Sequence, residues 1–239
     1  MQQIIKNKKI SFFKNTSYPI FEIDNFFNDF FYSELKENFP KFEELKKQNL
    51  SVYKNNKISI NSDSDVYRKI LENNFFLKKF DQFTKSYDFR KIFFHDLLNK
   101  IIISRGLDFK HFYKILRIKK FVDFSKKDKF HYLSFFTKIK TTIQYSYIIN
   151  GGSIVPHKDA TDKLVTLMIY LPDENIFENQ EQLGTTFWKS YYNSKSDEHL
   201  NNLNDREDFF LKSTKILKSK FTKNKIVGFI KNDKSWHSV

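Results

Sequence analysis

The spacing of apolar residues changes part-way along this chain. Between Asn25 and Asn99 they recur every three or four positions, which is typical of helices with one buried face. Three helical segments are predicted, with buried faces formed by Phe26, Phe27, Phe30, Phe31 and Leu35, then by Val66, Ile70 and Leu71 behind a cap at Asp65, and then by Phe89, Ile92, Phe93 and Leu97. Pro40 ends the first of them.

From Thr141 onward the pattern is typical of strands. Tyr145 and Tyr147 alternate with polar residues, and Leu164 to Leu171 is a nearly continuous apolar run, as in a strand buried on both faces. The predicted strands are 143–149, 164–171, 185–188 and 226–230, with a turn at Asn150-Gly151-Gly152 and a long polar loop over 191–208. We therefore predict an α+β fold in one domain, 1–239. Residues 1–139 would form a mainly helical support region, and 140–239 a β-sandwich or barrel.

Composition removes several classes of protein. Of 239 residues 40% are hydrophobic and 18% aromatic, which excludes a mostly disordered chain. Cysteine is absent, so disulfides and thiolate sites are excluded. The first residues carry lysines that do not suit a signal peptide, and no apolar run is long enough for a membrane span. We expect a soluble, cytoplasmic protein that does not bind membranes, of unknown oligomeric state.

The net charge of +14 suggests a nucleic-acid partner, but its make-up argues against a specific one. Of the 42 basic residues 37 are lysine, and they are spread along the whole chain. Arginine, which reads bases in bidentate fashion, is scarce. A basic protein that binds DNA or RNA through charge alone remains an alternative interpretation, to be tested by the salt dependence of such binding.

The candidate chemistry lies in two short motifs. His157 and Asp159, two residues apart in an extended segment, project to the same side and can reach one cation. His237 follows 80 residues later, after a short polar turn that ends the strand 226–230 and at the start of a further predicted strand. Two imidazoles and one carboxylate suit Fe(II), Mn(II) or Zn(II) and leave positions open for other ligands.

These motifs, in their order and strand context, resemble the iron(II)/2-oxoglutarate-dependent oxygenases, and within them the prolyl-4-hydroxylase-like group. The likeness covers about 141–239 and is carried by Tyr145-Ser146-Tyr147, Gly151-Gly152, Pro156-His157-Lys158-Asp159, the run 164–172, Gly184-Thr185-Thr186-Phe187-Trp188 and Ser235-Trp236-His237-Ser238-Val239. The resemblance implies a double-stranded β-helix, or jelly-roll, core in the C-terminal half, with the N-terminal helices packed around it.

The resemblance also implies roles for individual residues. His157, Asp159 and His237 would be the Fe(II) ligands. Tyr147 and Tyr170 would contact the co-substrate 2-oxoglutarate, since a phenol can donate a hydrogen bond to its carboxylate, and Thr166 is a weaker candidate on the same strand face as Tyr170. Ascorbate is a further cofactor that the resemblance allows.

One feature departs from the family pattern. Relatives carry an arginine or lysine about eight to ten residues after the second histidine, where it pairs with the distal carboxylate of 2-oxoglutarate. The given sequence ends at Val239, two residues after His237. We expect that the sequence is truncated; the alternatives are a cation from elsewhere in the chain and loss of co-substrate binding.

The predicted function is therefore an Fe(II)- and 2-oxoglutarate-dependent dioxygenase that hydroxylates a peptidyl residue, an amino acid or a small metabolite. The alternative is a non-catalytic jelly-roll module that binds a carbohydrate or a protein partner, which the absent cation favours and the complete set of ligands disfavours.

Overall fold

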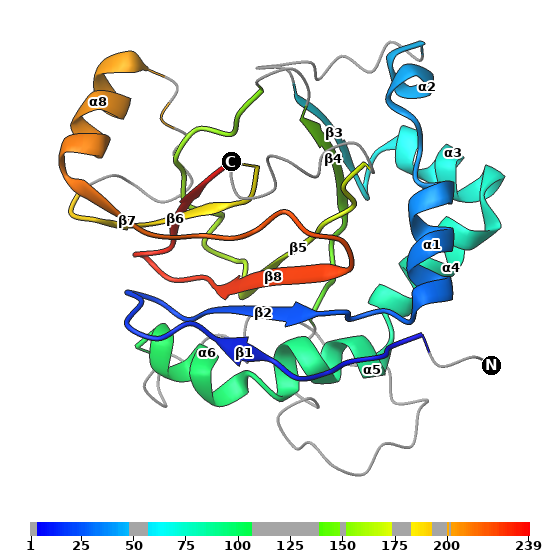
Figure 1. Cartoon of the computed structure of the whole chain (residues 1–239), viewed down its shortest axis with the longest axis horizontal. Coiled ribbons are helices and arrows are strands. Elements are labelled where there is room, and N and C mark those ends of the chain that lie inside the picture. Colours follow the sequence, from blue (N-terminus) through cyan, green and yellow to red (C-terminus); the bar gives the residue numbers. More distant parts are fainter. Residues whose placement is uncertain are drawn as a thin grey trace.

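The protein, seen here as a computed structural model, combines antiparallel sheets with helices packed beside and beneath them (Figure 1). The structure describes residues 4–47, 57–106, 139–148, 152–173, 183–192, 200 and 202–239. The mixed class of fold predicted from the sequence, helices with antiparallel strands, is confirmed for these residues.

The largest sheet joins strands from opposite ends of the chain. Its order is β1 (Ser11–Phe12), β2 (Ile20–Asp24), β8 (Lys225–Ile230) and β5 (Val165–Ile169), and all neighbours are antiparallel. Every residue of β8 is buried because the strand lies between two others and both of its faces are covered. Ile226 and Ile230 pack toward the helices, whereas Val227 and Phe229 pack toward the second sheet.

A second sheet is formed by strands from the C-terminal half of the chain. It has the order β7 (Ser213–Lys218), β6 (Thr186–Ser190) and β9 (Trp236–Ser238). Residues 154–157 continue it beyond β9, since Ile154 exchanges backbone hydrogen bonds with Val239, and His157 with His237. A separate antiparallel pair is formed by β3 (Lys57–Asn61) and β4 (Gln144–Ile148).

The helices cover the largest sheet and the β3–β4 pair, except for α8, which packs against the second sheet. They are α1 (Asp29–Asn38), α2 (Phe42–Lys47), α3 (Asp65–Asn73), α4 (Phe75–Thr84), α5 (Tyr87–Arg90), the π-helical turn η1 (Lys91–His95), α6 (Leu98–Ser104) and α8 (Leu203–Leu211). Figure 1 shows α5 and α6 running beneath β1 and β2, with α1, α3 and α4 at the side. Phe26 and Phe93 form part of the core between them, with ring centroids 5.6 Å apart. Among the described helices, none has the length and apolar character to span a bilayer.

The helical predictions are largely confirmed, with three corrections. The predicted face of Val66, Ile70 and Leu71 on α3 is only half-buried, and the buried residue of this helix is Tyr67. The first predicted stripe is buried except for Phe30, which is 59% exposed because α1 starts at Asp29 and turns this residue outward. The cap of α3 is Ser64 rather than Asp65, since the Ser64 hydroxyl accepts the hydrogen bond from the Tyr67 amide.

The strand predictions at β4, β5, β6 and β8 are confirmed, but others were missed. The strands β1, β2 and β3 lie in the half predicted to be mainly helical, and β7 was not predicted. The segment 164–171 is half-buried rather than buried on both faces, because β5 lies at the edge of the described sheet. The predicted loop over 191–208 contains the start of α8, and its residues 193–199 and 201 lie outside the described part, as do Asn150 and Gly151 of the predicted turn.

Candidate metal centre

Two segments that are far apart in the sequence bring the predicted ligands together. His157 ends the extended segment beside β9, and His237 is the middle residue of β9. Their backbones bond in both directions, at 3.0 and 3.1 Å, so the two imidazole rings lie side by side with centroids 4.2 Å apart. With Asp159 they form a buried cluster whose candidate ligand atoms all lie within 4.8 Å of one another. The structure thus assembles the set of three that the motifs predicted.

Backbone carbonyls orient both histidines. Nδ1 of His157 lies 2.9 Å from the carbonyl oxygen of Val155, and Nδ1 of His237 lies 3.2 Å from that of Ser235. A carbonyl only accepts, so each Nδ1 carries a proton, and the neutral form of each ring then has its lone pair on Nε2. This is the tautomer in which imidazole acts as a metal ligand, with its other nitrogen held by an outer partner.

Asp159 is kept ionised by its neighbours. Burial raises the pKa of this carboxyl, but His237 and the Lys163 ammonium outweigh burial and lower the pKa to about 2. Lys163 Nζ lies 2.6 Å from Oδ1, and the Thr166 hydroxyl donates to Oδ2 at 2.5 Å. A charged carboxylate beside two imidazoles whose Nδ1 atoms face backbone carbonyls is a donor set that fits a divalent ion such as Fe(II), Mn(II) or Zn(II).

The predicted co-substrate residues lie in three different settings. Thr166 donates its hydroxyl hydrogen bond to Asp159, one of the predicted metal ligands. The Tyr170 hydroxyl is buried between sheets, 2.9 Å from Thr185 Oγ1 and 2.7 Å from Ser219 Oγ. The Tyr147 hydroxyl donates to the carbonyl of Pro40, and the ring packs near Phe39. Contact of these three residues with 2-oxoglutarate stays a prediction.

Two lysines near the cluster were not among the site residues predicted from the sequence. Lys163 is four residues after Asp159, a spacing that could have drawn attention to it. Lys57, at the start of β3, is half-buried, and its pKa is lowered by burial and by Lys163, while Asp159 acts in the opposite direction. No local pattern in the sequence could have indicated Lys57, because its proximity to Asp159 and Lys163 depends on where β3 packs in the fold.

The surroundings of His237 are apolar and tightly packed. The Phe229 ring lies with its centroid 4.6 Å from that of the His237 imidazole, and Phe187 packs against Phe229 in turn. All three are buried. Such walls restrict water and hold the imidazole in one orientation, which favours a rigid centre.

Comparison of the chain with models of protein families, with curated proteins and with solved structures finds no match. A function can therefore be inferred from the geometry of this centre and from the motifs that produce it.

Proposed function

We propose that this protein is an Fe(II)- and 2-oxoglutarate-dependent dioxygenase that hydroxylates a peptidyl residue, an amino acid or a small metabolite. The observation that carries the proposal is the buried cluster of His157, Asp159 and His237, with ligand atoms within 4.8 Å of one another. Two imidazoles and one carboxylate leave positions on the metal open, which is the arrangement that non-haem iron oxygenases use.

The path of the chain between the sheets supports a jelly-roll core. From residues 154–157 in the second sheet it crosses to β5 in the largest sheet, returns to β6 and β7, crosses again to β8 and returns to β9. Repeated crossing between two antiparallel layers is the connectivity of a jelly roll. In this arrangement the cluster lies between the layers, since Thr166 on β5 reaches Asp159 and Phe229 on β8 contacts His237.

The residues of the chain would prepare this site in distinct ways. The carbonyls of Val155 and Ser235 hold both imidazoles in the ligand tautomer, and Thr166 fixes one oxygen of Asp159. Burial restricts water around the reacting groups. His157, Asp159 and His237 would hold the iron, which would supply the chemistry for oxidative decarboxylation of 2-oxoglutarate by dioxygen and hydroxylation of a C–H bond.

Anaerobic titration with Fe(II) and then 2-oxoglutarate tests the proposal. We expect stoichiometric iron uptake, followed by the weak visible charge-transfer band of a 2-oxo acid chelated to iron. Both signals should disappear in His157→Ala, because one of three ligands is lost. His95→Ala is the matched control, since His95 lies on η1 and outside the cluster.

The outcomes distinguish the dioxygenase from the non-catalytic binding module. Metal uptake with no band on adding 2-oxoglutarate would indicate a metal site without co-substrate binding and would contradict the dioxygenase. A protein that takes up no metal would point to the non-catalytic binding module instead.

A further inference from the structure

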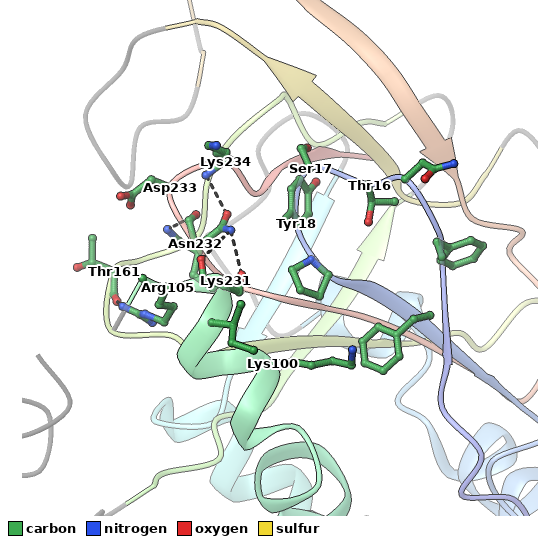
Figure 2. A pocket seen from close by; sticks show the side chains of 17 residues that line it. Thr16, Ser17, Tyr18, Lys100, Arg105, Thr161, Lys231, Asn232, Asp233 and Lys234 are labelled. Atoms are coloured by element: carbon green, nitrogen blue, oxygen red, sulfur yellow. Dashed lines mark hydrogen bonds between the residues drawn. The ribbon is translucent and has the colours of Figure 1, made fainter. Parts of the chain in front are cut away.

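A cavity of about 760 Å³ lies outside the three predicted ligands (Figure 2). Its walls come from residues 12–19, from the C-terminal part of α6 and from the turn 231–234. Cavities of this size are typical of sites for small molecules. Neither the metal centre nor the candidate co-substrate residues account for it.

The charged residues of the wall are mostly cations. Lys100, Arg105, Lys231 and Lys234 line the cavity, against the single carboxylate of Asp233. Positive charges that converge on a recess raise its potential and concentrate anions there. Because lysine is common over the whole chain, these cations indicate a binding site only where the fold holds them in an unusual way.

Lys231 is the most unusual of these cations. It directly follows β8 and is only 2% exposed, yet within the described part of the chain its ammonium makes one hydrogen bond, 2.9 Å to the carbonyl of Asn232. An ammonium has three donors. Burial lowers the pKa of Lys231; Asp233 and Asp159 oppose this effect, while Arg105 and Lys158 add to it. A buried charge with so little compensation is costly unless a ligand completes its partners.

The wall around Lys231 is preorganised. The Arg105 guanidinium donates to the carbonyls of Lys163 and Thr161, at 2.7 and 2.9 Å. Asn232 Nδ2 donates to Ser104 Oγ at 3.0 Å, which fastens the turn to the end of α6. Little further ordering is needed for a ligand to bind.

A neutral donor also lies in the wall. The Ser17 hydroxyl is buried and has no hydrogen-bond partner among the described residues. Buried hydroxyls without partners are rare in folded proteins, so this one also calls for an acceptor.

We propose that this cavity binds a small phosphorylated molecule, whose phosphoryl oxygens accept hydrogen bonds from the Lys231 ammonium and the Ser17 hydroxyl. A phosphoryl group carries up to two negative charges and three acceptor oxygens, which suits several cations and a hydroxyl better than a single carboxylate does. Lys100 and Lys234, both exposed, would add attraction at the rim. The inference does not depend on the dioxygenase function, because none of its residues is a predicted metal ligand.

Calorimetric titration of the protein with inorganic phosphate, at constant ionic strength, tests this proposal. We expect one saturable site, at least tenfold weaker in Lys231→Met, which keeps the length of the side chain but not its charge. Lys79→Gln should bind like the wild type, since this exposed lysine on α4 does not line the cavity. That control removes the same charge and so separates a site from general attraction to a basic protein.

A second variant and a second anion complete the experiment. If Lys231→Met does not fold, as judged by circular dichroism, the double variant Lys100→Gln/Lys234→Gln decides, because both side chains are exposed and their loss should weaken phosphate binding severalfold. Malonate, titrated in parallel, should bind more weakly than phosphate. The proposal is overturned by unsaturable binding, by equal affinity in the deciding variant and the wild type, or by malonate binding as tightly as phosphate.

Discussion

At the scale of single residues, the candidate centre depends on how Asp159 is held. Its two oxygens have different partners, Lys163 at Oδ1 and Thr166 at Oδ2. The Lys163 side chain is 45% exposed, so water can replace much of its attraction. Thr166 lies on a strand and cannot be replaced so easily. The hydroxyl of Thr166 is therefore the partner that sets the orientation of this carboxylate.

Thr166→Val should weaken metal binding by about tenfold, since outer partners of metal ligands typically contribute that much or more. Valine keeps the shape of threonine and removes only the hydrogen bond to Asp159. The dissociation constant for Mn(II) can be measured by competition with a chromophoric chelator. Thr214→Val, an exposed change on β7, should leave it unchanged. Equal affinity in Thr166→Val and the wild type would show that the hydroxyl does not support a ligand.

At the scale of elements, one side chain joins the two ends of the described fold. Asn224, just before β8, accepts from the Phe27 amide at 2.9 Å and donates to the Phe27 carbonyl at 2.8 Å. It is 4% exposed and adopts a φ of 54°, a left-handed conformation that asparagine tolerates better than most residues. The start of β8 is thereby fixed beside the segment that leads into α1.

Asn224→Ala should lower the free energy of unfolding by about 3 kcal/mol, because two backbone groups of Phe27 lose their buried partners and alanine is strained at positive φ. Urea denaturation measures the change. Asn15→Ala provides the comparison, since Asn15 is exposed and has a φ of 57°. It should cost only about 1 kcal/mol, the backbone part alone. If both variants lose the same stability, the bonds to Phe27 contribute nothing.

The elements also show where sequence patterns suffice. The helices at 29–38 and 65–73 and the strand at 225–230 could be predicted because their apolar period is long enough to read. β2 spans only five residues and is soon followed by α1. Its partner β8 lies about 200 positions later in the sequence. Nothing local marks such a pairing. The start of α8 was hidden because residues 204–208 are all polar, Leu203 is exposed, and only Phe209 of the helix is buried.

At the scale of the whole molecule, the candidate centre connects the two sheets. His157 and His237 belong to the second sheet, while from the largest sheet Thr166 bonds to Asp159 and Phe229 contacts His237. The three ligands could be predicted because their residue types and order carry the chemistry. The proximity of Lys57 to Asp159 could not be predicted, since it follows from how β3 packs in the fold. A metal bound here would therefore add side-chain bonds to the backbone hydrogen bonds that already join two segments 80 residues apart in the sequence.

Metal binding should consequently stabilise the entire fold. An ion that binds only the folded state, at a hundredfold excess over its dissociation constant, adds about 2.7 kcal/mol, which for a chain of this size raises the melting temperature by roughly 5–10 °C. We expect that rise on adding Mn(II) to the chelator-treated protein, followed by calorimetry. His237→Ala should show none of it, because β9 then lacks its ligand, whereas His95→Ala should show all of it. An equal rise in His237→Ala would place the ion elsewhere and exclude His237 from the centre.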